Sequence, residues 1–242
     1  MFGNRYIAAV RSVSKLYASV SRTAVPVINK NYLQQFSTTP RFFSHSAPAP
    51  AQQELTTALQ YEIDAEKRLE QENLGGSLSP SIPGFKITTN DAEVRLTKTH
   101  AGEEILVIFN VNHSVDVEDY ETEDAPVPVA LPPFAIEITK AGKRLCFHLE
   151  LLQTEDQEYD FRVEEFYVVD AVKNDNEAVE DTVYASSGKY IDPTLHELLF
   201  VRYLEERGFT ADFCRHLVEF ATHYEHSQYV GLLENIKAFV SK

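Results

Sequence analysis

Apolar and polar residues alternate with a period of two in several segments between about residues 85 and 187. This period is typical of β-strands, because successive side chains of a strand point to opposite faces of the sheet. Short glycine-containing turns join the first four segments into two hairpins, and no helical pattern separates the strands, so we expect an antiparallel sheet. The segments are AEVRLTKT, EILVIFNVNHS, FAIEITK, RLCFHLELL, DFRVEEFYVVDAV and DTVYASS.

A helical pattern precedes the sheet. In residues 54–73, Leu55, Leu59 and Ile63 recur every four residues, which predicts an amphipathic helix. The apolar stripe is thin for a helix of this length. We therefore expect it to require a partner surface, in its own domain or on a neighbouring subunit.

Helical periodicity returns over residues 193–240. Asp192 fits the N-cap of a first helix that ends at Gly208. A second helix is predicted from Thr210, with a break near His226, after which the apolar pattern resumes. The order helix, antiparallel sheet, helices predicts an α+β fold, with the helices at one face or end of the sheet.

The N-terminal segment has a composition of its own, because six basic residues and no acidic residue precede Glu54. A basic, serine-rich, amphipathic segment is typical of a mitochondrial presequence. A basic arm for nucleic acid or a membrane is the alternative. We expect a transit peptide at 1–44, a linker at 45–53, and a single domain at 54–242 that is delivered to the mitochondrial matrix. No run of about 18 apolar residues occurs, so no membrane span is expected.

The rest of the chain is strongly acidic. Six of the 22 basic residues lie in the leader, which leaves 16 against 37 acidic residues and a net charge of -21. Solubility explains part of this charge, although roughly 2 to 8 units suffice for that purpose. The surplus favours binding of cations and basic proteins, and it argues against direct contact with nucleic acid, which RNA-associated partners would have to mediate.

The densest acidic run lies within residues 115–134, between the second and third predicted strands. We interpret it as one half of an interaction whose basic half lies on another molecule. The candidate partner-binding residues are Asp116, Glu118, Asp119, Glu121, Glu123 and Asp124.

Few residues suggest chemistry. No phosphate-binding loop, HExxH, CxxC, nucleophile elbow or EF-hand spacing occurs. Cys146 and Cys214 are expected to be core residues, and the histidines at 216, 223 and 226 fit surface or cap positions better than a metal site. We therefore expect no enzyme activity, metal or cofactor. Clustered carboxylates leave a low-affinity divalent-cation buffer or sensor, for instance for calcium, as the alternative function.

Three stretches resemble the mitochondrial acidic matrix proteins, whose animal members are described as receptors for the globular heads of complement. The stretches are AEVRLTKTHAGEEILVIFNVNHS, YLEERGFTADFCRHLVEF and EHSQYVGLLENIKAFVSK. The leader, the acidic loop and the order of elements agree with this family too. The residues of the 115–134 segment do not align with the family, so binding is expected only at the level of the loop.

The resemblance implies a ring-shaped homotrimer whose subunits each contain a strongly twisted, seven-stranded antiparallel sheet flanked by N- and C-terminal helices. It also implies a non-enzymatic, multi-ligand or chaperone-like protein of the matrix that binds basic partners, ribosomal or RNA-associated ones among them, and supports mitochondrial translation and oxidative phosphorylation. The residues expected to pack in the trimer are Leu55, Leu59, Ile63, Leu233, Ile236 and Phe239.

Overall fold

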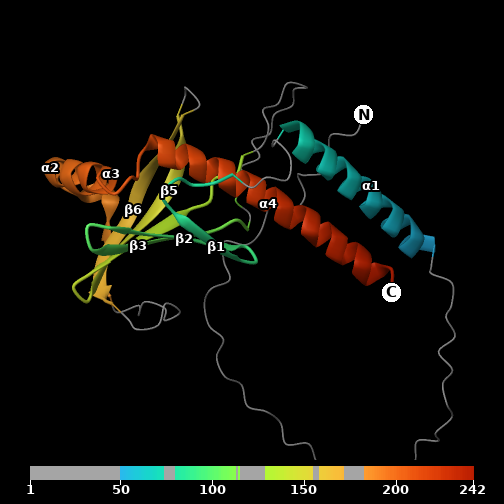
Figure 1. Cartoon of the computed structure of the whole chain (residues 1–242), viewed down its shortest axis with the longest axis horizontal. Helices are drawn as coiled ribbons and strands as arrows, with labels where there is room; N and C mark the ends of the chain where they lie inside the picture. The colour runs from blue at the N-terminus through green and yellow to red at the C-terminus, as the bar shows by residue number, and fades with distance from the viewer. Residues whose placement is uncertain (1–49, 74–79, 113, 115–128, 155–157, 172–182) are drawn as a thin grey trace, which may run out of the picture. The chain divides into compact units, whose positions relative to one another are not determined.

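The structure, a computed structural model, describes residues 50–73, 80–112, 114, 129–154, 158–171 and 183–242. All of them belong to one compact unit, Pro50–Lys242. The core of this unit is a seven-stranded antiparallel sheet in which each strand pairs with its neighbours in sequence (Figure 1). The strands are β1 (Lys86–Asn90), β2 (Glu93–His100), β3 (Glu103–Asn110), β4 (Phe134–Lys140), β5 (Lys143–Gln153), β6 (Tyr159–Asp170) and β7 (Ser186–Ser187).

Helices precede and follow the sheet. Helix α1 (Pro50–Asn73) comes first. A helical segment made of α2 (Pro193–His196), a π-helical stretch η3 (Glu197–Arg202) and α3 (Tyr203–Glu205) follows a short 3₁₀ turn, η2 (Gly188–Tyr190). The last element is the long helix α4 (Ala211–Val240). The predicted α+β fold, with a seven-stranded antiparallel sheet between N- and C-terminal helices, is confirmed.

Two tight turns set the register of the central hairpins. Ala101 and Gly102 join β2 to β3, and Ala141 and Gly142 join β4 to β5. All four residues have positive φ angles, between 47° and 79°. Two-residue turns of this kind match the right-handed twist of the strands that they connect. The HAGE and AGK motifs therefore form the hairpins that the sequence predicts.

The hydrophobic core lies between one face of the sheet and the C-terminal helices. Strand residues such as Leu96, Val107 and Ile136 are buried beneath Phe213 and Leu217 of α4. Aromatic rings extend this contact, because the Phe109 ring of β3 and the Phe220 ring of α4 meet edge to face at 6.3 Å. Geometry of this kind adds to the burial of apolar area.

Both cysteines are buried and free, as the sequence indicates. Burial raises the pKa of Cys146 to about 11 and that of Cys214 to about 12. Both are therefore neutral thiols near pH 7 and act as small core side chains.

The two edges of the sheet differ from the sequence prediction. Strand β1 was not expected, because its sequence KITTN has little apolar character and only Ile87 aligns with the buried face, opposite Leu96. At the other edge, DTVYASS was predicted to be a strand, but of its described residues, 183–187, only Ser186 and Ser187 pair with β6. Both edge strands form through hydrogen-bonded pairing with the neighbouring strand, and their own sequences show little alternation of apolar and polar residues.

The helices also differ at two points. Helix α1 begins at Pro50, inside the expected linker, and the Gln52 amide in its first turn donates a hydrogen bond to the Val240 carbonyl of α4. The predicted break near His226 is wrong, because α4 runs unbroken for 30 residues. His226 lies 3.5 Å from Glu66 of α1, and Ser227 donates a hydrogen bond to the Tyr224 carbonyl of its own helix, so polar residues at this point are compatible with a continuous helix.

Candidate functional site

The six candidate carboxylates between Asp116 and Asp124 lie outside the described residues. The structure does describe the base of the segment that carries them. Leu131 N donates to the Ser114 carbonyl over 2.7 Å, so the two ends of the segment meet. Ala130 N donates to Thr222 Oγ1 of α4 over 2.9 Å. The acidic segment therefore leaves the fold from a buried base that is attached to α4.

Further acidic residues of the sequence fall between or at the ends of strands. Glu158, Asp160 and Asp170 are exposed, and Asp170 pairs with Lys143 across the β5–β6 ladder. The remaining acids of these connections lie outside the described residues: Glu155, Asp156, Asp175, Glu177, Glu180 and Asp181. Exposed surface pairs such as Lys143–Asp170 contribute little to stability.

The six residues expected to pack in a trimer divide into two groups. Leu59, Ile63 and Leu233 are buried together between α1 and α4 of a single chain, with Tyr229 and Val240 packed against them. The other three are exposed: Leu55 at 44%, Ile236 at 37% and Phe239 at 80%. The structure thus supplies the thin stripe of α1 with an intramolecular partner, and it leaves a second apolar surface uncovered.

A groove of about 370 Å³ lies beside this cluster, between α1 and α4. Lys67 Nζ pairs with Glu234 Oε1 across it over 2.6 Å, and the Lys237 ammonium donates to the Gln60 amide oxygen. These bonds span both helices. They stabilise the docked position of α1, with modest energy because the partners are exposed.

Two histidines of α4 face two glutamates of α1 further along the same contact. His223 Nε2 lies 3.7 Å from Glu70 Oε1, and His226 Nδ1 lies 3.5 Å from Glu66 Oε2. Both histidines are largely buried, as is Glu66. The spacings Glu66/Glu70 and His223/His226 place each pair on one helix face, but the sequence alone does not show that the two faces meet.

The third histidine belongs to a different environment. His216 Nδ1 lies 2.7 Å from the Asp212 carbonyl of its own helix. In the described ranges, no three His, Cys, Asp or Glu side chains are placed to hold a metal ion together. The three histidines that are close in sequence are therefore divided by the fold between two separate sites.

The most buried ion pair links the sheet to the turn between α3 and α4. Arg207 Nε and Nη2 donate to the two carboxylate oxygens of Glu103 over 2.8 and 3.0 Å. Lys140 Nζ adds a contact of 3.1 Å, and the guanidinium lies 3.3 Å from the centroid of the Tyr203 ring. Hydrogen bonding to Arg207 lowers the pKa of Glu103 against the opposing effect of burial. In the sequence, nothing marks Glu103 beyond its place next to the turn between two predicted strands.

Lys98 supports the same turn. Its ammonium donates to the Arg207 carbonyl and lies 4.2 Å from the centroid of the Phe85 ring. Burial lowers the pKa of Lys98. The Arg207 and Lys98 contacts fix Gly208, whose φ of 83° ends the helical segment as the sequence predicts.

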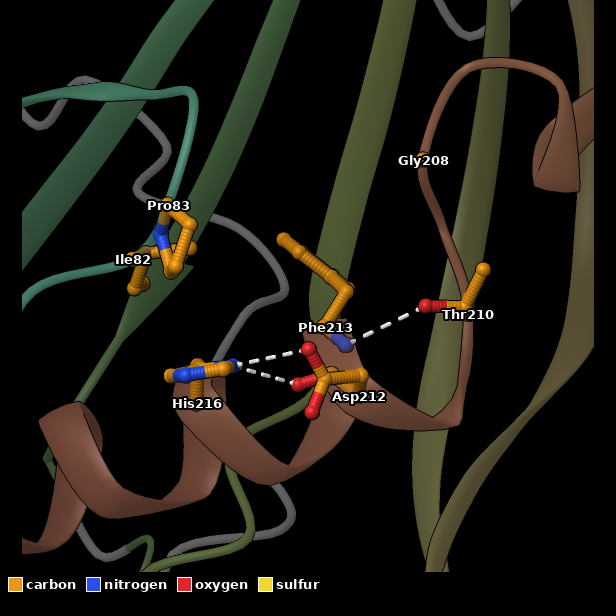
Figure 2. A pocket seen from close by; sticks show the side chains of 7 residues that line it. All are labelled: Ile82, Pro83, Gly208, Thr210, Asp212, Phe213 and His216. Carbon is orange, nitrogen blue, oxygen red and sulfur yellow. Dashed lines mark hydrogen bonds and ion pairs between the residues drawn. The ribbon is translucent and has the colours of Figure 1, made fainter.

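A cavity of about 70 Å³ lies next to this turn (Figure 2). Figure 2 shows Asp212 and His216 of α4 directed toward each other, and Thr210 capping the helix through Phe213 N. The volume is well below that of typical ligand pockets, which begin near 300 Å³. This cavity does not form a pocket for a substrate or cofactor.

The chain is similar in sequence to several known proteins. The family model described as mitochondrial glycoprotein matches residues 55–240. The chain is 61% identical to "Conserved regulator of innate immunity protein 3" of Caenorhabditis elegans over 84% of this chain and 89% of that protein. It is 30% identical to "Complement component 1 Q subcomponent-binding protein, mitochondrial" of Bos taurus, over 74% of this chain and 68% of that protein.

A solved structure shares the fold. The crystal structure of the Trypanosoma brucei p22 protein has a TM-score of 0.60 to this chain and 21% identity, and it covers 79% of this chain and 100% of its own. At this identity the likeness concerns the fold alone. Within the described residues, no helix has the length and apolar character to cross a bilayer.

Proposed function

The chain belongs to the mitochondrial glycoprotein family, a family of mitochondrial binding proteins, and from this premise we propose that it captures basic proteins in the mitochondrial matrix. It acts as a non-enzymatic, multi-ligand or chaperone-like protein, and its partners include basic proteins that serve mitochondrial translation and oxidative phosphorylation. Residues 1–44 deliver it to the matrix. The functional part of the molecule is then its acidic surface rather than a pocket.

The observation that carries the proposal is the charge of the chain. The segment after residue 51 has 37 acidic and 16 basic residues, with all six leader cations excluded. Like charges on a compact body repel one another and reduce its stability. Capture of cationic proteins gives this surplus a use, because a field of one sign raises the local concentration of oppositely charged partners and accelerates their encounter.

The structure supports this proposal through the position of the acidic segment. Its base is held by the Ser114–Leu131 hydrogen bond and by Thr222 of α4. A partner that binds the segment is therefore attached to the rigid sheet and to α4.

We further propose that the working form is a homotrimer. Ile236 and Phe239 of α4 are exposed, as is Leu232, and the spacing of the three residues places them on one face of the helix. An exposed stripe of this kind fits a protein interface. Trimerisation would also multiply the acidic segments on one particle, which strengthens the binding of partners with several basic sites.

The test neutralises the acidic segment. The six carboxylates from Asp116 to Asp124 are replaced by Asn and Gln, and capture of basic matrix proteins by the immobilised chain is measured at low and physiological salt. We expect at least a tenfold loss of capture at low salt and an unchanged trimer, because an interaction with exposed charges is strong only where salt does not screen it.

The matched control neutralises six exposed acids elsewhere: Glu54, Glu72, Glu104, Glu158, Asp160 and Glu205. This variant has the same net charge but an intact segment, so it should retain most of the capture. Equal capture by the segment variant and the wild type would contradict the proposal. Equal loss in both variants would show that the field of the whole molecule, rather than the segment, attracts partners.

A divalent-cation buffer or sensor remains the second candidate, because six carboxylates lie within nine residues, from Asp116 to Asp124. Calcium prefers six to eight oxygen ligands in a defined arrangement. Without such an arrangement we expect only weak, salt-sensitive binding. Calorimetric titration with calcium separates the two functions, since a stoichiometric site of micromolar affinity would favour the sensor.

A further inference from the structure

The exposed large apolar side chains of the described residues fall into two groups. One group lies on α1 and α4 and includes the residues assigned above to the subunit contact. The other group lies between β6 and η3, in a part of the chain to which the proposed function gives no role. Its members are Val168, Tyr184, Tyr190, Leu195 and Leu198. The last three lie within nine residues of one another, as is typical of an interaction surface.

These three residues lie on a segment that projects from the fold, and we name Tyr190, Leu195 and Leu198 the α2 surface. Residues 192–198 are all exposed, whereas Ile191 and Leu199 on either side of them pack against the hydrophobic core. Figure 1 shows α2 beside β6. Because the segment is attached to the core at both ends, its apolar side chains stay in one small region of the molecular surface.

The backbone of the α2 surface is held in place. Asp192 caps α2 by accepting hydrogen bonds from two backbone N–H groups of the first turn, over 3.0 and 3.2 Å. The helix continues into η3, where the Phe200 ring meets the Phe166 ring of β6 edge to face at 5.2 Å. Leu195 and Leu198 are three residues apart and so lie on one side of the helical segment. A partner therefore meets an ordered surface, which lowers the entropic cost of binding.

The charges around the α2 surface leave no unpaired lysine or arginine among the described residues 183–206. This range contains two such bases, and each pairs with an acid. Lys189 Nζ lies 2.8 Å from Glu164 Oε2, and Arg202 Nε lies 3.2 Å from Glu197 Oε1. The same range contains four acids. The α2 surface thus combines apolar side chains with a surrounding net negative charge.

This combination fits one class of partner. A basic amphipathic helix has an apolar face flanked by Lys and Arg, whose long side chains extend along apolar surface while their charged ends reach acids. We propose that the α2 surface binds the apolar face of basic amphipathic helices in the proteins that the chain captures. A second copy of this chain is a less favourable occupant, because each copy carries a net charge of -21 outside the leader.

The inference rests on the proposed capture of basic proteins and names the part of the binding that salt does not screen. Charges on the acidic segment accelerate encounter with a partner, and their effect falls as the salt concentration rises. Apolar contact with Leu195 and Leu198 does not depend on charge. Basic partners that have an apolar helix face should therefore be held more tightly at physiological salt than equally basic partners without one.

Equilibrium binding of fluorescent peptides to the full chain, followed by anisotropy at about 0.15 M salt, tests the α2 surface. The first probe is a synthetic peptide of Lys and Leu, about 18 residues or five helical turns long, whose leucines lie on one helix face. The second probe is a scrambled isomer of the same composition, and the third has Glu in place of Lys. We expect the first probe to bind at least about tenfold more tightly than either of the others. Equal affinity for the first probe and either of the others would overturn the proposal.

Variants assign the binding to the α2 surface. The double variant Leu195→Ser, Leu198→Ser should lose at least about tenfold in affinity for the first probe and keep its affinity for the scrambled isomer. The matched control is Tyr61→Ser, Leu69→Ser, which removes two exposed apolar side chains of α1 and should bind as the wild type does. Undiminished affinity of the first double variant would contradict the proposal. A shift of that variant toward monomer in sedimentation would also contradict it, because the α2 surface would then be a subunit contact.

The proposed function fails or succeeds in a separate measurement, the capture of basic proteins by the variant neutralised from Asp116 to Asp124. Loss of capture in that variant, together with unchanged peptide binding in the leucine variant, would reject the α2 surface and retain the acidic segment. The reverse result would reject the acidic segment and support the α2 surface as the place where partners bind.

Discussion

Glu103 is the first residue of β3, yet its carboxylate is one of the most buried polar groups in the described part of the chain. It accepts two hydrogen bonds from Arg207 and one from Lys140. The importance of such a carboxylate for stability lies mainly in the penalty for removing it, because its partner would then be a buried, unpaired charge. Here the loss would leave the Arg207 guanidinium buried without its charge partner, because that side chain is 8% exposed.

Glu103→Gln should therefore lower the free energy of unfolding by about 3 kcal/mol, within the range for breaking a buried pair. Urea denaturation at pH 7 measures the loss. Glu104→Gln is the control, since Glu104 is exposed on the same strand and should change stability by less than about 0.5 kcal/mol. Equal effects of the two substitutions would contradict the role assigned to Glu103.

The same residue predicts a pH dependence. Arg207 lowers the pKa of Glu103 below its usual range, so the unfolded chain binds a proton at higher pH than the folded chain. The stabilisation is present above the ordinary glutamate pKa, near 4.3, and is lost as pH falls through the lower folded value. As pH is lowered from 6 to 3, the free energy of unfolding measured by urea denaturation should decrease more for the wild type than for Glu103→Gln.

At the scale of the element, α1 packs on α4 through a small apolar cluster, so the docked position of α1 depends on each member of that cluster. We expect Ile63→Ala to release α1, because truncating a buried isoleucine costs about 2 to 5 kcal/mol. Hydrogen exchange should accelerate in α1 and remain unchanged in the sheet. Leu69→Ala, on an exposed position of the same helix, should have no such effect. Simultaneous loss of protection in the sheet would show that α1 is an integral part of the core.

The elements also show where sequence patterns succeed and where they end. Strands β2 to β6 were predictable because each alternates against one buried face, as in the series Glu103, Ile105, Val107 and Phe109. Strand β1 was missed because only Ile87 marks its inner side. An alternating pattern predicts a strand when one of its faces is buried. It does not predict a strand such as β1, which is held mainly by its hydrogen-bonded pairing with a neighbour.

Long-range contacts limited the reading of the helices. The polar residues around His226 resemble a loop in sequence, although the helix continues and His226 itself pairs with Glu66. The contact between Glu66 and His226 could not be predicted, because no local periodicity shows that these two distant residues meet. The acidic segment was evident from composition alone, because charge density requires no partner to be recognised.

At the scale of the whole molecule, two kinds of surface should respond to salt in opposite ways. Subunits that each carry a net charge of -21 outside the leader repel one another, and salt weakens that repulsion. Contact through apolar residues such as Phe239 does not require charge. We therefore expect assembly to strengthen and capture of basic proteins to weaken as ionic strength rises from about 20 to 200 mM.

Sedimentation of Phe239→Ser tests the assembly. If Phe239 lies in the subunit contact, its replacement should shift the chain toward monomer while its secondary structure is retained, because the side chain is 80% exposed in a single chain. Tyr190→Ser is the control, since Tyr190 is 91% exposed but lies in the η2 turn after the sheet. An assembly that resists Phe239→Ser would place the subunit contact elsewhere.

The hydrogen bond from Leu131 to Ser114 has a consequence for how such a chain diversifies. Because the two ends of the intervening segment are already joined, its length and composition can change with little effect on the strands on either side. Doubling the length of such an insert costs only about 0.6 kcal/mol in closure entropy. If the acidic segment binds partners as proposed, replacing it with another sequence at the same base should change which partners bind and leave the sheet and α4 intact.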